Sequence, residues 1–428
     1  MNSARAVIGA NFGDEGKGLM TDYLVTEHQS DLVIRFNGGA QAGHTVQLPD
    51  GRRHVFSHFG SGSFAGAATL LSRFFIVNPM IFTREYSELA IKLPENMDVK
   101  IDANAPVTTP FDMLLNQLVE QKRGESRHGS CGLGIGETIE RGEKFLKLTA
   151  QHLTDETSLI GKLLAIRDTW VEIRKQQLGL DNSQDHILKS DVLIENYLND
   201  VRFMIAQSII VNGAETIQAA HNPVFEGAQG LLLDQDHEFF PHVTRSNTGI
   251  KNMLALAAEA SIREVEVYYM TRAYLTRHGA GPLMDELPRL PWKIVDETNI
   301  SNDWQGSLRF ANLNVDQLKK SIFDDLKSNY SNIKIKPRIA ITCLDQVSAP
   351  LPILQGDRYV NLYQTGADDS ADDLGDQIAR AVGLFGNHFK SFGPRRSDVV
   401  DYIREVDAQI ERESHKRRKK QHKICSVI

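Results

Sequence analysis

The segment from Gly9 to Gly18, with the sequence GANFGDEGKG, has the residue types of an anion-binding turn. It follows the apolar run Ala6-Val7-Ile8, which predicts a buried strand, and it precedes residues 19–25, whose apolar spacing predicts a helix. A glycine-rich turn in this position favours a phosphate, because its backbone N–H groups and the helix dipole both attract an anion. The segment departs from the P-loop pattern, since Asn11 replaces the first glycine and Gly18 replaces the Ser or Thr that would hold magnesium.

Acidic and basic side chains in this turn indicate more than simple anion binding. Asp14 and Glu15 would repel a phosphate unless a metal ion bridges them or one of them acts as a base, and Lys17 supplies a mobile positive charge. His44 follows a second glycine-rich turn, so we expect it in a cleft beside the acidic loop. An ordinary surface turn could also hold Gly-Asp-Glu-Gly, but the strand before it and the helix after it favour the functional interpretation.

Two later strands are predicted to end in polar turns. Residues 224–226 run into Gly227-Ala228-Gln229-Gly230, and open α/β sheets bind ligands where strands end in this way. The loop over residues 244–248 is rich in hydroxyl groups, which suits a phosphate. Residues 338–345 are predicted to form a strand that ends in Asp345, whose carboxylate could accept two hydrogen bonds from a ligand.

Other segments must position these residues. Residues 32–36 and 70–77 have the pattern of buried strands, and residues 123–144 are predicted to form a glycine- and charge-rich loop whose backbone could meet a phosphate. Residues 151–212 are predicted to be mainly helical, with a helix stop at Asn212-Gly213. Strands that alternate with helices are typical of an α/β fold.

The composition narrows the class of protein. The chain has 428 residues, of which 41% are hydrophobic and 24% are charged, as in globular proteins with a large core. The formal net charge of -7 argues against a general nucleic-acid binder. Cys131, Cys343 and Cys425 are too widely spaced for a disulfide framework or a metal-ligand pair, which fits a reducing compartment. No apolar run reaches membrane-spanning length, so we expect a cytoplasmic protein.

Six motifs occur in collinear order over residues 5 to about 400, and with them the chain resembles the adenylosuccinate synthetases. The first two are Gly-Asp-Glu-Gly-Lys-Gly at residues 13–18 and Gly-Gly-Ala-Gln-Ala-Gly-His-Thr at residues 38–45. The other four lie at residues 129–136, 225–230, 276–282 and 342–345.

This resemblance implies a fold and a domain organisation. The expected fold is α/β, with a central, mostly parallel sheet flanked by helices, similar to P-loop NTPases with helical insertions. One domain would span residues 1–400, with a helical segment at about 151–212, and a C-terminal helix and basic tail would follow at 401–428. The resemblance also implies a homodimer.

The family joins L-aspartate to C6 of a 6-oxopurine nucleoside monophosphate, normally IMP, and uses GTP with Mg²⁺. It phosphorylates O6 and then displaces the phosphate with the amine of aspartate. The resemblance implies that Asp14 removes the N1 proton and ligates Mg²⁺, and that His44 is the general acid. It implies that the backbone carbonyl of Gly43 is a further magnesium ligand.

The resemblance distributes the remaining site residues among three substrates. Ser307 and Arg309 would bind aspartate. The purine monophosphate would lie against Asn37, Gln41, Ser130, Cys131, Gln229 and Thr244. GTP would be bound by Gly13, Glu15, Gly16, Lys17, Gly18, Gly43, Thr45, Cys343, Asp345 and Gly393.

Several positions depart from the family pattern. Cys343 replaces a lysine that packs over the guanine base, although Asp345 is kept. The loop expected to bind aspartate has lost its run of arginines, so that only Ser307 and Arg309 remain. The phosphate-binding arginine of the second subunit has no clean match, and Arg141 is the nearest candidate. Two alternatives therefore stay open: a (d)GMP acceptor, which would give 2-aminoadenylosuccinate, and a non-catalytic guanine-nucleotide sensor.

The end of the chain has the form of a lipidation signal. Cys425-Ser426-Val427-Ile428 fits the C-a-a-X pattern of prenyltransferases, and a cluster of basic residues lies upstream between Lys416 and Lys423. A lipid chain and a basic patch together would tether the protein to an anionic membrane. The alternative is a solvated basic tail that happens to end in this way.

Overall fold

The computed structural model describes residues 3–93, 97–290, 292, 294, 306–348, 350–362 and 373–402. Most of the loop expected to bind aspartate and the whole basic tail, including Cys425, lie outside these ranges. Among the described residues, no helix has the length and apolar character needed to cross a membrane.

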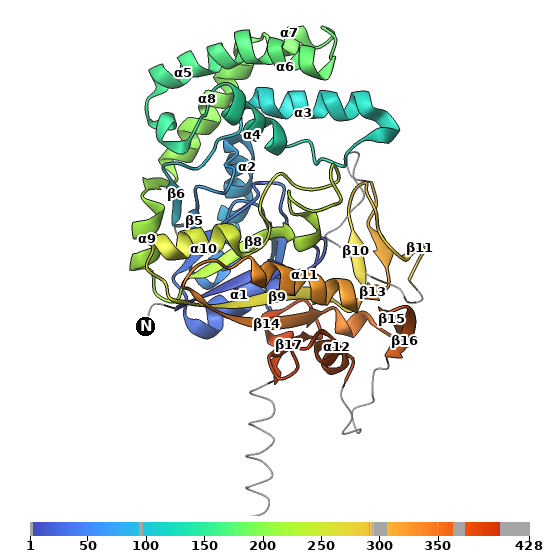
Figure 1. Cartoon of the computed structure of the whole chain (residues 1–428). Helices are drawn as coiled ribbons and strands as arrows, with labels where there is room; N and C mark the ends of the chain where they lie inside the picture. Colours follow the sequence, from blue (N-terminus) through green and yellow to red (C-terminus); the bar gives the residue numbers. More distant parts are fainter. Residues whose placement is uncertain are drawn as a thin grey trace, which may run out of the picture.

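The described residues form a central ten-stranded sheet, whose neighbouring strands are parallel except at one edge (Figure 1). At that edge β18 is antiparallel to β17. The expected α/β fold with a mostly parallel sheet is thereby confirmed. In spatial order the strands are β18 (Val399–Asp401), β17 (His388–Ser391), β14 (Lys334–Thr342), β9 (Glu264–Arg272), β1 (Ser3–Gly9), β8 (Val224–Gly230), β2 (Leu32–Arg35), β5 (Ala68–Leu71), β6 (Val99–Asp102) and β7 (Ile209–Val211).

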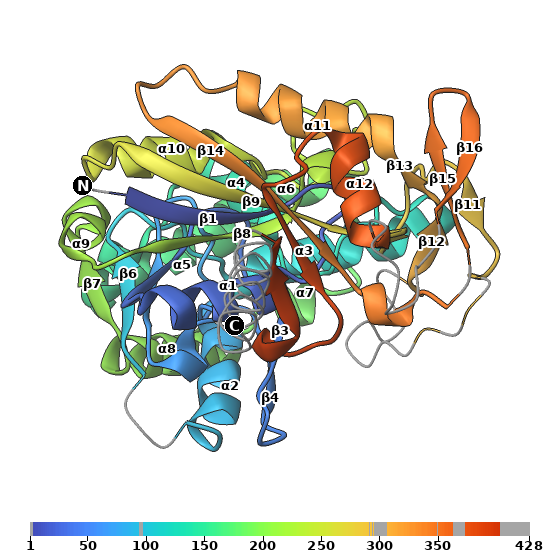
Figure 2. The same ribbon diagram turned by 90° about the horizontal axis from the view of Figure 1, so that it is seen from below.

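The central strands are buried on both faces, and successive side chains alternate between the two. Ala6 and Ile8 of β1 belong to one apolar cluster with α10 (Ile250–Glu259), α11 (Val315–Lys327) and α12 (Leu374–Val382). Val7 belongs to the opposite cluster with Met20 and Leu24 of α1 (Lys17–His28). Figure 2 shows α10 and α11 on one side of the strands and α1 on the other. Because helices cover both faces, these strands appear in the sequence as continuous apolar runs.

A group of helices lies together at the top of Figure 1 and has its own apolar cluster, which includes Trp170 and Tyr197. Residues 151–212, expected to be mainly helical, contribute four of these helices and end in β7. The group comprises α2 (Pro79–Ala90), α3 (Pro110–Arg123), α4 (Ile135–Lys144), α5 (Glu156–Ala165), α6 (Val171–Leu178), α7 (Asp185–Leu188) and α8 (Asp191–Ala206). The division of the chain into one domain and a tail stays a prediction.

The remaining elements are short and connect or extend these layers. They are β3 (His44–Gln47), β4 (Arg53–Phe56), α9 (Gly213–Ala219), β10 (Leu275–Arg277), β11 (Glu286–Leu287), β12 (Arg309–Ala311), β13 (Leu313–Asn314), β15 (Leu351–Gln355) and β16 (Arg358–Leu362).

The structure corrects three local predictions. The strand predicted over residues 70–77 ends at Leu71, because Ser72 begins a turn that is closed by hydrogen bonds to its own carbonyl and hydroxyl oxygens. Residues 135–144 form α4 rather than a loop, since their buried side chains recur at helical spacing. Asn212 begins helix α9 instead of ending a helix, because its side-chain oxygen accepts two backbone N–H groups of the first turn.

Candidate functional site

The predicted site residues gather at the carboxyl ends of the central strands. Because these strands are parallel neighbours, their ends meet at one edge of the sheet, where open α/β sheets bind ligands. In spatial order, residues 392–393 follow β17, residues 343–345 follow β14, Arg272 ends β9, residues 13–18 follow β1, Gln229 lies at the end of β8, and Asn37 follows β2. The turn at 13–18 therefore lies between the residues expected to bind the guanine base and those expected to bind the purine monophosphate.

Three glycines determine the shape of this turn. Gly13 has a φ of 112° and Gly16, the N-cap of α1, has a φ of 84°, which are values that side chains rarely allow. At Gly18 a Cβ would lie 2.7 Å from the carbonyl oxygen of Thr45 and 3.1 Å from Cβ of His44. Close packing of α1 against β3 thus explains why glycine replaces the P-loop Ser or Thr, and it brings His44 to the turn.

Asp14 lies at the open side of the turn, where its side chain is 26% exposed. Its Oδ2 is 3.2 Å from Nδ1 of His278, and its backbone carbonyl accepts a hydrogen bond from Nε of Arg272. Burial raises the pKa of Asp14, but the contact with His278 and the charges of Arg272 and Lys17 outweigh it and hold the pKa below the ordinary 3.8. Asp14 is therefore ionised at neutral pH, as a base or a metal ligand must be.

Glu15 and Lys17 are both buried and fix the turn from inside. Oε1 of Glu15 accepts the backbone N–H of Asn11 at 2.8 Å, and burial raises the pKa of Glu15 to about 7 although Lys17 opposes this shift. Nζ of Lys17 donates to the carbonyl of Gly13, and burial lowers the pKa of Lys17. Since the Glu15 side chain faces inward, only its backbone is placed to meet a phosphate.

His44 is paired with a buried carboxylate. Its Nδ1 lies 2.7 Å from Oε1 of Glu226, and both side chains are almost fully buried. Because an ionised carboxylate only accepts hydrogen bonds, this contact places the proton on Nδ1 and leaves Nε2 for a substrate. Burial lowers the pKa of His44 to about 4, an effect that Glu226 opposes. A carboxylate that orients an imidazole is the arrangement found in acid–base catalysis.

Glu226 is a residue to which the sequence analysis assigned no role. It lies within β8, where it accepts hydrogen bonds from the backbone N–H of Ser61 at 3.0 Å and from the Ser61 hydroxyl, and Nη1 of Arg35 is 3.9 Å away. Burial raises the pKa of Glu226, but the charges of His44 and Arg35 outweigh it and bring the pKa to about 2. The available signal was an acidic residue inside an apolar strand, since buried glutamate is rare unless it is paired.

A cavity of about 430 Å³ lies beside the turn. His278 is in its wall and connects it to Asp14 through the contact described above. The cavity has the size of a small-molecule site. It lies between Asp14, the predicted catalytic base, and the loops that are predicted to bind phosphate. Five of the residues assigned to the purine monophosphate line it: Gln41, Ser130, Cys131, Gln229 and Thr244.

Asn37, the sixth residue assigned to the monophosphate, does not line this cavity. Its Oδ1 accepts the N–H of Ala228 at 2.7 Å, and its Nδ2 donates to the carbonyl of Ala228 at 3.0 Å. The next residue, Gln229, has a φ of 57°, which is unusual for a residue with a side chain and is typical of functional positions. Both ends of its amide are engaged, so Asn37 fixes the backbone beside Gln229. Contact between Asn37 and the purine monophosphate stays a prediction.

Cys343, Asp345 and Gly393 follow the adjacent strands β14 and β17, so they lie at the same end of the sheet. Cys343 has a φ of 59° and starts a short 3₁₀ turn that exposes Asp345. Burial raises the pKa of Asp345, and the charge of Asp398 adds to this effect. Gly393 packs so closely that a Cβ would lie 2.4 Å from Oδ2 of Asp398. The carboxylate of Asp345 is thus accessible to a base bound beside these turns.

Arg309, expected to bind aspartate, is engaged within the chain. It forms a two-pronged ion pair with Glu286 and donates to the carbonyls of Gly279 and Gly281 at 3.1 and 2.9 Å. These contacts hold the loop between β10 and β11. Ser307, the other expected aspartate ligand, is exposed just before β12.

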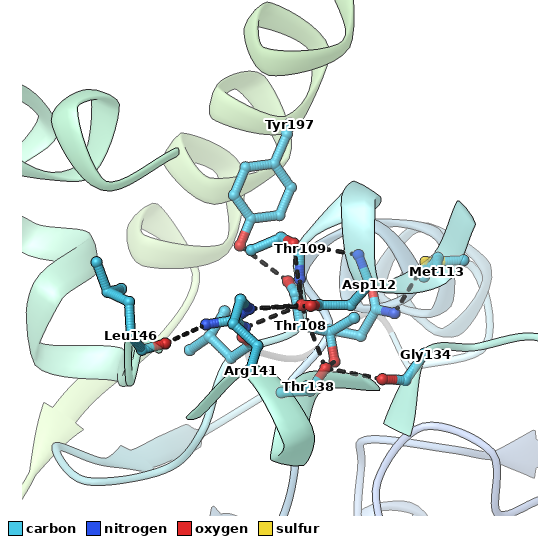
Figure 3. A network of polar contacts seen from close by, with 11 residues as sticks. Thr108, Thr109, Asp112, Met113, Gly134, Thr138, Arg141, Leu146 and Tyr197 are labelled. Carbon is cyan, nitrogen blue, oxygen red and sulfur yellow. Dashed lines mark hydrogen bonds and ion pairs between the residues drawn. The ribbon is translucent and has the colours of Figure 1, made fainter. Parts of the chain in front are cut away.

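Arg141, the nearest candidate for the phosphate-binding arginine of a second subunit, is fully buried. Figure 3 shows its guanidinium against Asp112. The Nε–Oδ1 and Nη2–Oδ2 distances are both 2.9 Å. It also donates to the carbonyls of Val107 and Leu146 at 2.9 and 2.8 Å. Arg141 therefore holds α3 and α4 together, and the suggestion that it reaches a partner's substrate is wrong.

The donors at the turn fit a magnesium ion that is shared with a triphosphate. In the part of the chain that the structure describes, no group of three or more His, Cys, Asp or Glu side chains could hold a metal ion. Asp14 is ionised and partly exposed, and Gly43, whose carbonyl is the other expected ligand, is exposed. Mg²⁺ usually keeps waters and takes phosphate oxygens beside one or two protein ligands, so this small donor set suits it.

Sequence comparisons relate the chain to one family. The profile of the adenylosuccinate synthetase family matches residues 6–303. The adenylosuccinate synthetase of Synechococcus sp. (strain RCC307) is 33% identical over 285 residues, which cover 66% of this chain and 63% of that protein. That of Thermoplasma volcanium is 32% identical over 67% of this chain and 64% of the relative. The matched region thus spans slightly less than two-thirds of these relatives.

Two solved structures share the fold. The fully ligated adenylosuccinate synthetase of Plasmodium falciparum superposes with a TM-score of 0.68 and 18% identity over 93% of this chain and 99% of that chain. The succinoaminodeoxyadenylate synthetase of cyanophage S-2L, bound to dGMP and dATP, superposes with a TM-score of 0.57 and 15% identity. The superposition covers 94% of this chain and 95% of that chain. Identities this low establish the fold alone. The profile match covers well over half of the chain, and on this basis the chain belongs to the adenylosuccinate synthetase family.

Proposed function

We propose that this protein is a ligase that couples GTP hydrolysis to the joining of L-aspartate to C6 of a 6-oxopurine nucleoside monophosphate, with IMP as the first candidate acceptor. One observation carries the proposal: ionised Asp14, Lys17 and the His44–Glu226 pair meet at one edge of the sheet, beside a 430 Å³ cavity. Membership of the adenylosuccinate synthetase family supports the same reaction.

The chemistry must convert O6 of the purine into a leaving group. In the proposed mechanism Asp14 takes the N1 proton, and O6 then attacks the γ-phosphoryl group of GTP while the bond to the β-phosphate breaks. The amine of aspartate next forms a bond to C6, and O6 leaves with the phosphate. The turn at 13–18 and Lys17 hold the triphosphate, and this positioning supplies much of the rate enhancement.

His44 acts on the leaving diphosphate in this mechanism. Its low pKa in the free chain follows mainly from burial, and negative charge beside a histidine raises its pKa. A bound triphosphate therefore favours the protonated ring, and Glu226 on Nδ1 stabilises that cation. Nε2 can then donate a proton or a hydrogen bond to the oxygen that leaves.

Asp14 and the carbonyl of Gly43 would hold Mg²⁺, which neutralises charge on the triphosphate when it is bound. Asp345 would accept hydrogen bonds from guanine of GTP, and the residues lining the cavity would receive the monophosphate. A homodimer is also part of the proposal, and sedimentation analysis at micromolar concentration tests it.

A substrate matrix tests the proposed function. IMP, GMP or dGMP is combined with L-aspartate or buffer and with GTP or ATP, and phosphate release is followed. The proposal expects release only when nucleotide, aspartate and triphosphate are all present, and the matrix ranks the three candidate acceptors and the two triphosphate donors. Tight nucleotide binding without coupled release would contradict the ligase and support the sensor.

A further inference from the structure

The loop that should receive the monophosphate already holds an anion from its own chain. The backbone N–H groups of Gly129 and Ser130 donate to Oε2 of Glu120 at 3.2 and 3.4 Å. Glu120 lies on α3, is only 2% exposed and is in the wall of the 430 Å³ cavity. Its other oxygen, Oε1, accepts a hydrogen bond from Nη1 of Arg123 at 2.5 Å.

The geometry of this loop is suited to an anion and is fixed by other contacts as well. Gly129 has a φ of 86°, and a Cβ there would lie 2.8 Å from the backbone nitrogen of Ala280. Consecutive N–H groups beside such a glycine form a concave anion site. The hydroxyl of Ser130 donates to Oδ1 of Asn116 at 2.7 Å and accepts the N–H of Gly132 at 3.2 Å, so the loop is attached to α3 independently of Glu120.

The contacts between the two N–H groups and Glu120 are long. Charge-assisted N–H···O bonds are usually about 2.7–2.9 Å, whereas these are 3.2 and 3.4 Å. The contact with Arg123 is much shorter, so Arg123 is the main partner of this carboxylate. A phosphate monoester carries more charge and more terminal oxygens than a carboxylate, and it can satisfy the same N–H groups more fully.

We propose that Glu120 is an internal competitor for this anion site, which the phosphate of the substrate must displace. The N–H groups of Gly129 and Ser130 are thus a phosphate subsite, and the contact of the Glu120 carboxylate with these groups sets its affinity. The identification of the incoming phosphate as that of a nucleoside monophosphate rests on the proposed function. After displacement Glu120 keeps Arg123 as its partner, so its charge stays compensated.

The test uses Glu120→Gln, which keeps the length and an acceptor oxygen but removes the competing charge. Binding of inorganic phosphate, IMP and inosine to the full chain is measured by calorimetry at constant ionic strength. We expect phosphate and IMP to bind on the order of tenfold more tightly, because a neutral acceptor holds N–H groups less strongly than a carboxylate. The affinity for inosine, which has no phosphate, stays the same.

The matched control is Glu137→Gln. Glu137 also lines the cavity, but its carboxylate is paired with Arg174 at 2.7 and 3.0 Å. If both variants bound phosphate equally more tightly, the effect would come from the loss of any negative charge near the cavity, and the proposal would be overturned. Unchanged or weaker phosphate binding in Glu120→Gln would show that Glu120 only stabilises the conformation of the loop, and this result would also overturn the proposal.

Glu120→Asp is a second variant should the first unfold, which circular dichroism detects. It keeps the charge but withdraws the carboxylate from the N–H groups, so phosphate should again bind more tightly, and unchanged binding refutes competition. The inference and the proposed function fail separately. If phosphate responds as expected but neither IMP, GMP nor dGMP binds any variant, the anion site stands and the assignment of the nucleotide falls.

Discussion

Replacing Glu15 by Gln should stabilise the protein above neutral pH, although Glu15 lies in the centre of the site. Oε1 of Glu15 accepts the N–H of Asn11, whereas Oε2 is buried and has no hydrogen-bond partner among the residues that the structure describes. Gln preserves the acceptor for Asn11, and it removes the charge that burial disfavours. The variant therefore isolates the free-energy cost of placing an ionised carboxylate inside the turn.

The size of this effect follows from the pKa. Burial raises the pKa of Glu15 from 4.5 to about 7. Since one pKa unit corresponds to about 1.4 kcal/mol, ionisation of Glu15 costs the folded state up to ~3 kcal/mol. Because this pKa is raised on folding, the contribution of Glu15 to stability is most favourable below pH 4.5 and is lost as the pH rises from 4.5 to about 7. The advantage of Glu15→Gln should therefore grow by about 2–3 kcal/mol between pH 5 and pH 8.

Urea unfolding of both proteins at pH 5, 6, 7 and 8 measures this difference directly. Titrating groups distant from Glu15 are common to the two proteins, so their contributions cancel in the difference between free energies of unfolding. A difference that is constant over this range would show that Glu15 titrates normally in the folded chain. A variant that is less stable at pH 8 would refute the reasoning about burial.

Four further predictions concern single residues. Asp14→Asn should lower turnover by ~10²–10⁴-fold and leave triphosphate binding nearly intact, as kinetics and calorimetry would show; near-normal turnover refutes its role as base. Glu226→Gln should lower kcat by roughly 10²-fold or more, because Nδ1 of His44 loses its carboxylate partner; ¹⁵N spectra report the tautomer, and an unaltered ring with normal kcat contradicts the assignment. Asp345→Ala should flatten a preference for GTP over ATP, and a wild type that prefers ATP argues against base recognition by this carboxylate. If the C-a-a-X end is prenylated, Cys425→Ser should release the protein from membranes of eukaryotic cells, whereas a wild type that is wholly soluble and unmodified by mass spectrometry ends the lipidation hypothesis.

The features that the sequence predicted well are local ones. Residues 6–8 and 19–25 identify β1 and α1 because a buried strand leaves a short apolar run and a packed helix leaves apolar residues at helical spacing. The glycines at 13 and 16 have the positive φ values that a tight anion-binding turn requires. The reason for Gly18 could not be inferred from the neighbouring sequence, since the contact that forbids a side chain there comes from β3, which lies more than 20 residues later.

The features that the sequence missed depend on distant partners. The contact between His44 and Glu226 spans 182 positions, so no local pattern records it. Arg141 was misassigned because its partner Asp112 is 29 residues away and lies on a different helix. The residues around the cavity were named through family resemblance, and tertiary packing alone distinguishes Gln229, which lines it, from Asn37, which holds the backbone behind it.

Transfer of the purine oxygen tests the central claim most directly. The acceptor nucleotide is labelled with ¹⁸O at position 6 and incubated with GTP, Mg²⁺ and L-aspartate, and the released inorganic phosphate is examined by mass spectrometry or by the isotope shift of its ³¹P signal. Activation of O6 by phosphorylation predicts one ¹⁸O atom in each phosphate released, with IMP as the acceptor or with whichever of GMP and dGMP supports turnover. Unlabelled phosphate from a reaction that nevertheless consumes aspartate would contradict the account.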